Sequence, residues 1–386
     1  MKYCLILIVL CISSFALGDD DFYTIEDLLK EDFSDVIEAE VEDDQKWLVP
    51  QFDGSLKWMT EQEAKDQTIK TEIVEQIKWA INHFSNKRRK VRFLLFTQKN
   101  PVKWQEIDMD RPETLERSNF NASHPTRIFS HGWLGGVHHD LNTQLVDAHL
   151  QNGRKENYNV ILVDWSCWAM TVNYYFARLR TRKAGKRTAE LIDFLHEKTG
   201  MPFETTYVYG HSLGAHVAGF TGKQVTKGKI KTIIGLDSAM PLFRLKNPQN
   251  RIADTDAEYV ESMHTNGQVL GFYNPIGQAA FYPNGGRSQP DCGFSPFNCS
   301  HGRAVTYLAE AIARGNKNSF DTVTCDEFKD VKARNCSKSS GGVKMGDPDN
   351  FKKAKGVYFL ETNEKSPFGI GDQYFKKITR IFVIVM

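Results

Sequence analysis

The pentapeptide Gly210-His-Ser-Leu-Gly214 lies between an apolar, strand-like segment and a helix-like segment. A G-x-S-x-G match alone is weak, but a strand before it and a helix after it form the context of a nucleophile elbow. Glycines permit the tight turn, and the Ser212 hydroxyl then stands at the carboxyl edge of a sheet beside a helix N-terminus. This feature predicts a parallel sheet with a reactive serine at its edge.

The segments around the pentapeptide alternate between two hydrophobic patterns. Short apolar runs predict strands, and apolar residues at helical spacing predict helices. The expected strands are 91–97, 126–130, 159–163, 206–209, 231–234 and 259–263, and the expected helices are 184–198, 213–221 and 304–314. Strands separated by helices indicate a mostly parallel sheet that is covered on both faces. We expect one catalytic domain over residues 45–386, in which 381–386 forms a packed terminal strand.

A serine hydroxyl needs a base and an acid, which in such a fold follow it in the order acid, then histidine. Asp237 follows Ile233-Ile-Gly-Leu236 and lies 25 residues after Ser212, enough for one helix and a returning strand. A right-handed crossover brings it to the edge that holds Ser212. Asp164 also ends a strand but precedes the serine, which disfavours it. Asp254 and Asp256 are the remaining alternatives.

Three histidines follow Ser212, namely His216, His264 and His301. His216 precedes every candidate acid and lies in the helix that the elbow opens, so we expect it to pack in the interior. His264 ends an expected strand. His301 is the best candidate base, because it opens a helix beside Cys299, in a segment that an expected disulfide fixes.

The segment His131-Gly-Trp133 follows the strand that ends at Ser130. A backbone N–H in this segment, together with that of Leu213, would bind the oxyanion of a tetrahedral intermediate. The alternative is that His131-Gly132 is only a turn.

The first residues have the features of a secretory signal peptide. Residues 1–18 contain one lysine, a short apolar run and a small-residue cleavage site at Ala16-Leu-Gly18. The apolar run is shorter than a membrane-spanning helix needs. We therefore expect a secreted, extracellular protein.

Charge is distributed unevenly along the chain. Residues 19–44 hold thirteen acidic side chains and one lysine, whereas the whole protein carries only +1. This acidic leader is either a flexible, solvated segment or a pro-segment that covers a basic face. Near neutrality argues against a nucleic-acid partner. The basic clusters 87–90 and 178–187 are expected to be solvated faces, with attraction to anionic lipid as the alternative.

Secretion permits disulfides, and four of the seven cysteines form two closely spaced pairs. We expect the bonds Cys292–Cys299 and Cys325–Cys336, and we expect Cys167 to be a buried, unreactive thiol. Asn121-Ala-Ser123 is an N-glycosylation acceptor, while the acceptors at Asn298 and Asn335 include disulfide cysteines.

Several motifs together resemble the pancreatic lipase family, in its secreted insect neutral-lipase or phospholipase A1 branch. They cover about residues 85–365 and are Ser130-His-Gly-Trp133, Val163-Asp-Trp165, Gly210-His-Ser-Leu-Gly214, Gly235-Leu-Asp237, Phe281-Tyr-Pro-Asn-Gly-Gly286 and Cys299-Ser-His301. The resemblance implies an α/β-hydrolase fold and hydrolysis of lipid esters at a membrane, micelle or droplet surface. It also implies Ser212 as nucleophile, Asp237 and His301 as its partners, and Trp133 and Leu213 as oxyanion donors. A non-catalytic, yolk-type relative is the alternative from another class, although all three triad positions hold competent residues.

The chain departs from the family's triacylglycerol lipases in its covering loops. Only residues 293–298 lie between Cys292 and Cys299, and as a helix they would span only about 9 Å. The loop between His264 and Phe281 also looks short for the family. An open cleft of this kind is similar to the phospholipase A1 pattern, and triacylglycerol lipase is the alternative.

Other parts of the family's architecture are also reduced. About 25 residues follow Phe359-Leu-Glu-Thr362, so we expect no C-terminal β-sandwich domain and no colipase. The family's calcium loop falls near residues 251–256, where its acidic ligands are only partly matched. We therefore expect no required metal and no cofactor, and the oligomeric state stays open.

Overall fold

The computed structural model describes residues 45–53, 55–67, 91–137, 139–150, 156–293, 299–313 and 320–371. The expected signal peptide, acidic leader, basic cluster 87–90 and terminal strand lie outside these residues, as does residue 314, where a predicted helix was to end. The strands β1 (Lys46–Pro50) and β2 (Leu56–Thr60) form an antiparallel hairpin, and residues 61–67 continue from it as a helix.

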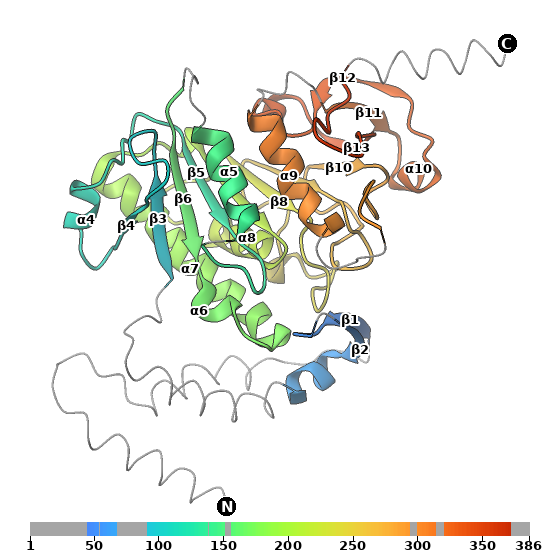
Figure 1. The fold of residues 1–386 in the computed structure, drawn as a ribbon, viewed down its shortest axis with the longest axis horizontal. Coiled ribbons are helices and arrows are strands. Elements are labelled where there is room, and N and C mark those ends of the chain that lie inside the picture. The colour runs from blue at the N-terminus through green and yellow to red at the C-terminus, as the bar shows by residue number, and fades with distance from the viewer. Residues whose placement is uncertain are drawn as a thin grey trace, which may run out of the picture. The chain divides into compact units, whose positions relative to one another are not determined.

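Eleven strands of the described residues form one large sheet (Figure 1), in the order β12-β11-β13-β10-β9-β8-β7-β5-β6-β3-β4. The seven strands from β13 to β6 run parallel, and the strands beyond them at each end pair antiparallel. The strands are β3 (Arg92–Phe96), β4 (Gln105–Ile107), β5 (Thr126–Ser130), β6 (Asn159–Asp164), β7 (Thr206–His211), β8 (Thr232–Leu236), β9 (Tyr259–Met263), β10 (Ala279–Pro283), β11 (Asp321–Cys325), β12 (Lys338–Lys344) and β13 (Gly356–Leu360).

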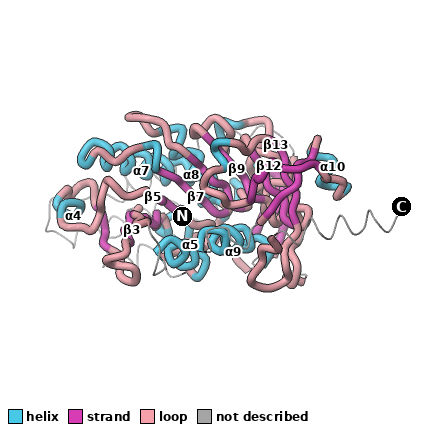
Figure 2. Tube along the Cα trace, turned by 90° about the horizontal axis from the view of Figure 1, so that it is seen from above, coloured by secondary structure: helices cyan, strands magenta, loops and turns pink. Residues whose placement is uncertain are grey.

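Helices cover both faces of this sheet (Figure 2). The helices α7 and α8 pack together on one face, and α5 and α9 pack together on the other. Helices of the described residues are α4 (Glu113–Glu116), α5 (Asp140–Leu150), α6 (Ser166–Ala169), α7 (Tyr174–Thr199), α8 (Leu213–Gln224), α9 (Cys299–Ala313) and α10 (Phe328–Ala333), with short 3₁₀ turns at Phe203–Thr205, Pro248–Asn250 and Asn350–Lys352. The predicted α/β-hydrolase architecture, with a mostly parallel central sheet, is confirmed.

The central strands are apolar on both faces because helices bury both sides of a parallel sheet. Every residue of β5, β6, β7, β8 and β9 is buried. Side chains such as Ile128, Ile161 and Val208 are completely inaccessible to solvent. This burial fixes the strand register and therefore fixes where the carboxyl ends of these strands meet.

The helix predicted at 184–198 begins ten residues earlier, at Tyr174. Asn173 caps it, since its Oδ1 accepts a hydrogen bond from the N–H of Phe176 at 2.9 Å. The basic cluster 178–187 is therefore not simply a solvated face. Arg180 is buried with its guanidinium over the Phe176 ring, and Arg178 forms an ion pair with Glu61.

Both expected disulfides are present, Cys292–Cys299 and Cys325–Cys336. Cys167 is a free thiol, as expected, but the expectation that it is buried is wrong, because the residue is exposed. It lies in the short helix α6, which follows β6 onto the surface instead of continuing into the core. No helix within the described ranges has both the length and the apolar character that crossing a bilayer requires.

Candidate active site

Ser212 lies in the turn between β7 and α8 with φ = 57°, in the left-handed region that non-glycine residues seldom adopt. The glycines on either side make this turn possible. A β-carbon on Gly214 would lie 2.1 Å from the carbonyl oxygen of Ser130, and one on Gly210 would lie 2.0 Å from that of Gly214. Close backbone packing therefore requires both glycines, and the strained serine has the geometry of a nucleophile elbow.

Asp237 follows β8 directly, and its carboxylate is completely buried. Its Oδ1 accepts hydrogen bonds from the N–H groups of Thr265 at 2.8 Å and Asn266 at 2.9 Å. Its Oδ2 lies 2.5 Å from Nδ1 of His301. The two amides leave one oxygen directed at the imidazole, so the residues after β9 orient the acid.

His301 lies in the first turn of α9, two residues after the disulfide-bonded Cys299. Because Nδ1 faces Asp237, that nitrogen carries the proton and Nε2 is left as a proton acceptor. The carbonyl oxygen of His301 accepts a hydrogen bond from Nε2 of His211, the residue before Ser212, at 3.0 Å. Burial, and secondly the nearby His301, hold the pKa of His211 well below its ordinary value, so His211 stays neutral.

The backbone also joins Ser212 to the strand that carries the acid. The N–H of Ser212 donates to the carbonyl of Leu236 at 3.1 Å, and the carbonyl of Ser212 accepts from the N–H of Ala239 at 3.2 Å. Ser212 is thus bonded to residues on both sides of Asp237. Of the three candidate catalytic residues, His301 is bonded directly to Asp237, and Ser212 is joined through its backbone to the residues around Asp237.

The loop after β5 approaches the serine closely. A β-carbon on Gly132 would lie 2.9 Å from the β-carbon of Ser212. Among the described residues, the backbone N–H groups of Trp133 and Leu213 donate no hydrogen bond to a protein acceptor. Leu213 is the first residue of α8, where the N–H has no partner within the helix. Two unused donors therefore flank the nucleophile.

Sequence reasoning missed what holds this loop in place. Nε1 of Trp165 donates to the carbonyl of His131 at 2.8 Å, and the Trp165 ring stacks on the His131 imidazole. The Trp133 indole is also fixed, by a hydrogen bond to the carbonyl of Thr171 at 2.8 Å. The sequence offered one sign of this arrangement, which is that Trp165 follows the end of a buried strand beside the expected oxyanion segment.

Asp164, which the sequence disfavoured as the triad acid, instead helps to hold the loop after β5. It forms an ion pair with Arg92, whose Nε donates to Asp164 Oδ2 at 3.0 Å. Burial alone would raise the pKa of Asp164, but hydrogen bonds from the side chains of His131, Ser166 and Arg92 outweigh burial and hold that pKa well below its usual range. Asp164 is therefore ionised and structurally paired.

The other candidate histidines pack in the interior. His216 stacks on Phe243 and bonds to the carbonyl of Ala239 at 2.7 Å, and burial lowers its pKa to about 3. His264 is fully buried and stacked on Tyr282. Neither side chain bonds to Asp237.

The segment considered for calcium is held by an ion pair between Lys223 and Asp256. Burial raises the pKa of Asp256 to about 6, and its Oδ2 accepts from the N–H of Ala253 at 2.9 Å. Within the described ranges, no cluster of three or more histidine, cysteine or acidic side chains is arranged to hold a metal ion.

The sheet order, the two helix layers and the strained turn at Ser212 define an α/β-hydrolase fold. The model of the Lipase family matches residues 56–368, so the chain belongs to the Lipase family. This confirms the resemblance to the pancreatic lipase family.

Two curated relatives illustrate the similarity. Lipase member H-B of Xenopus laevis is 34% identical over 264 residues, which cover 64% of this chain and 54% of the relative. Hepatic triacylglycerol lipase of Homo sapiens is 34% identical over 320 residues, covering 74% and 62%. The chain thus spans less than two thirds of the length of these relatives.

Proposed function

We propose that the protein hydrolyses carboxylic esters of lipids through an acyl-enzyme. The observation that carries this proposal is the bond between His301 Nδ1 and the buried Asp237, beside a serine in a strained elbow. In such a site Ser212 attacks the ester carbonyl while Nε2 of His301 takes its proton. Asp237 stabilises the imidazolium, and the N–H groups of Trp133 and Leu213 bind the oxyanion.

The second half of the reaction uses the same groups. The imidazolium gives its proton to the departing alcohol, and the fatty acyl group stays on Ser212. Water then attacks the acyl ester while His301 again acts as base, and the fatty acid leaves. Neither half requires a cofactor or a metal ion.

Replacement of the nucleophile tests this proposal. Ser212→Ala is expected to lower kcat by several orders of magnitude, with a small residual rate from oxyanion stabilisation. Ser118→Ala is the matched control, because Ser118 is a part-buried serine bonded to the carbonyl of Leu115 near α4. A fluorophosphonate probe should label the control and spare Ser212→Ala. A protein that does not label at Ser212 would be a lipid carrier, the competing function.

Exposed apolar side chains near the catalytic edge favour a lipid surface as the place of action. Trp58 and Phe52 of the β1–β2 hairpin are 65% and 62% exposed, unusually high for such large apolar residues. Glu61, just after β2, pairs with Arg178 at the start of α7 and with Arg244 after β8. The hairpin is thereby tied to elements that border the site.

Two further exposed apolar residues lie in the loop after β5, which carries Trp133, and in the segment after α6. Leu134 and Met170 are exposed, and the N–H of Leu134 bonds to the carbonyl of Ala169 at 3.0 Å. Trp58→Ser should weaken binding to phosphatidylcholine vesicles while leaving hydrolysis of a soluble short-chain ester unchanged. If Trp58→Ser and the natural protein bound vesicles equally well, Trp58 would not belong to a lipid-binding surface.

For the substrate, we favour phospholipid with phospholipase A1 specificity over triacylglycerol. The support is the short spacing between Cys292 and Cys299, which leaves little chain for a cover. Release of the sn-1 fatty acid from phosphatidylcholine, compared with release from a triglyceride emulsion, decides between the two. Faster turnover of the emulsion would make the protein a triacylglycerol lipase.

We also propose an extracellular location. The support is the sequence of residues 1–18, which has the charge, apolar run and cleavage site of a secretory signal. Expression in a secreting cell, followed by N-terminal sequencing of the medium protein, tests the location. Intact residues 1–18 on cell-retained protein would contradict it.

A further inference from the structure

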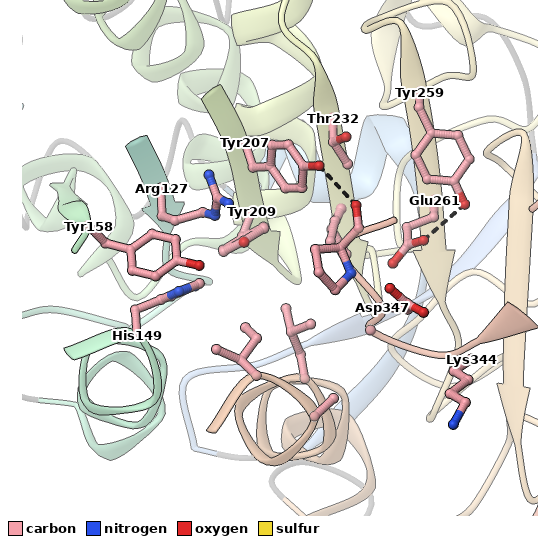
Figure 3. A pocket seen from close by; sticks show the side chains of 16 residues that line it. Arg127, His149, Tyr158, Tyr207, Tyr209, Thr232, Tyr259, Glu261, Lys344 and Asp347 are labelled. Atoms are coloured by element: carbon pink, nitrogen blue, oxygen red, sulfur yellow. Dashed lines mark hydrogen bonds between the residues drawn. The ribbon is translucent and has the colours of Figure 1, made fainter. Parts of the chain in front are cut away.

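A cavity of about 290 Å³ lies between the sheet and the helices α5 and α9 (Figure 3). Its roof is a row of register partners on four neighbouring strands, Arg127 on β5, Tyr207 on β7, Thr232 on β8 and Tyr259 on β9. These residues are the first or second of their strands, whereas Ser212 and Asp237 follow the last residues of β7 and β8. The cavity is therefore separate from the catalytic edge.

One end of the cavity is cationic. Arg127 is buried, and no acidic side chain among the described residues forms an ion pair with it. Its Nη1 bonds to the carbonyls of Thr126 and Thr205, and its guanidinium lies 4.2 Å from the ring centre of Tyr207. A buried charge without a counter-ion is costly, so this end favours an oxyanion.

The other end carries the acidic Glu261 and Asp347, together with Lys344, whose Nζ is paired with Asp321 at 3.2 Å. Glu261 is almost completely buried, and its Oε2 accepts bonds from the Tyr259 hydroxyl at 2.9 Å and from Asn350 at 3.1 Å. Its Oε1 has no hydrogen-bond partner in the described structure. Burial raises the pKa of Glu261 to about 7, and Asp347, which also lines this end, acts in the same direction. An ammonium group here would bond to the empty oxygen and stabilise the charged carboxylate.

The middle of the cavity combines two available hydroxyl groups with an apolar floor. Within the part of the chain that the structure describes, the Tyr209 hydroxyl makes no hydrogen bond, and the buried Thr232 hydroxyl has no partner other than the neighbouring Tyr207 side chain. The floor is formed by Leu308, Ala311 and Ile312 of α9. Unsatisfied polar groups above an apolar floor are typical of a binding site that is empty.

We propose that this cavity binds a small zwitterion, with an oxyanion at Arg127, an ammonium group at Glu261 and an apolar linker over α9. Three strand spacings separate the strands of Arg127 and Glu261, about 14 Å between their backbones. After the reach of both side chains is subtracted, a linker of several carbon atoms fits. Omega-amino carboxylates have this pattern.

Calorimetric titration of the whole protein with 6-aminohexanoate, hexanoate and hexylamine tests each end. The zwitterion should bind at least about tenfold more tightly than either fragment, because it makes both charged contacts. Equal affinity for hexanoate and 6-aminohexanoate would overturn the acidic end. No binding of 6-aminohexanoate at millimolar concentration would overturn the whole proposal.

Variants that remove single hydroxyl groups from the cavity test whether the ligand binds there. Tyr209→Phe deletes a hydroxyl that bonds to nothing in the described structure, and Thr232→Val deletes one whose only neighbour is the Tyr207 side chain. Folding should therefore be preserved, and each variant should weaken binding about three- to tenfold. Tyr282→Phe is the matched control, since Tyr282 is a buried tyrosine outside the cavity whose hydroxyl bonds to the carbonyl of Tyr273. Affinity unchanged in both cavity variants would place the ligand elsewhere.

The catalytic site does not enter this proposal. Ser212→Ala should bind 6-aminohexanoate as the natural protein does, whether or not the protein proves to be an esterase. Loss of binding in Ser212→Ala would place the zwitterion in the catalytic cleft and refute the separate site.

Discussion

At the scale of single residues, the site depends on how Asp237 is held. Two backbone amides occupy one carboxylate oxygen and His301 occupies the other. The imidazole is therefore fixed in the tautomer that leaves Nε2 as the proton acceptor. The strained backbone of Ser212 is the second requirement at this scale, because it presents the hydroxyl at the end of β7.

Asp237→Asn tests the role of the acid. An asparagine oxygen still accepts from the amides of Thr265 and Asn266, but its NH₂ then faces Nδ1 of His301 and favours the wrong tautomer. We expect kcat to fall about 10⁴-fold while the melting temperature changes little. Steady-state kinetics on a soluble ester measure the fall. A decrease of less than tenfold would show that Asp237 does not orient the base.

At the scale of elements, the carboxyl ends of adjacent strands support one another. β6 ends in Asp164, and Trp165 after it holds the carbonyl of His131 after β5. The loop that carries the unused N–H of Trp133 is therefore positioned by the neighbouring strand and not by its own residues alone.

Trp165→Phe removes that hydrogen bond and should misplace the N–H of Trp133, one of the two oxyanion donors. We expect kcat to fall more than tenfold with a smaller change in KM, and stability to fall by about 1–3 kcal/mol because a buried carbonyl loses its partner. Thr322→Val is the control, since Thr322 of β11 donates a comparable bond to the carbonyl of Val343 in β12. Equal kcat losses in the two variants would indicate a general effect of destabilisation.

Much of the sheet was predictable because its central strands are apolar runs with burial on both faces. β5, β7 and β9 agree with the predicted ranges to within two residues. The outer strands were missed for physical reasons. β12, at the edge, is largely exposed and contains two glycines, so it shows no clear strand pattern. The inner strand β10, between β9 and β13, was also missed, because it is short and ends in a proline. The start of α7 was hidden by its arginines, whose ion pair and ring contacts no local pattern reveals.

The candidate catalytic residues could be chosen from the sequence for a different reason. Ser212 lies in a recognisable turn, and Asp237 directly follows β8, the strand that comes one helix after β7, so chain order and crossover geometry were enough to propose them. The amides of Thr265 and Asn266 were not predictable, because backbone donors leave no trace in residue type. The contact of Trp165 with His131 depends on two strands that are neighbours only in space.

At the scale of the whole molecule, the two ends of the parallel strands differ in character. The carboxyl ends carry the candidate catalytic residues, whereas the amino halves carry a polar row under α5 and α9. Polar groups inside a core usually cost stability, and Glu261 is the clearest instance.

The raised pKa of Glu261 makes stability depend on pH. With a pKa of about 7 in the folded protein against an ordinary value of 4.5, the folded state binds more protons between these values. The free energy of unfolding must therefore fall as pH rises from 4.5 to 7. Glu261→Gln keeps an acceptor for Tyr259 and Asn350 but cannot ionise. It should be more stable than the natural protein by up to about 3 kcal/mol at pH 8, with little difference near pH 4.5.

Urea unfolding of Glu261→Gln and of the natural protein at pH 8 and near pH 4.5, without added ligand, measures this difference in the free energy of unfolding. A stability difference that is the same at both pH values would mean that Glu261 titrates normally.

A covalent acyl-enzyme on Ser212 is the central claim, and trapping that intermediate tests it most directly. The protein is mixed with an ester that deacylates slowly, quenched in acid during turnover and analysed by peptide mass spectrometry. The acyl mass should appear on the peptide that contains Ser212 and should be absent from Ser212→Ala. Turnover of the ester with no acylated peptide, or with the acyl group on another residue, would contradict the proposed chemistry.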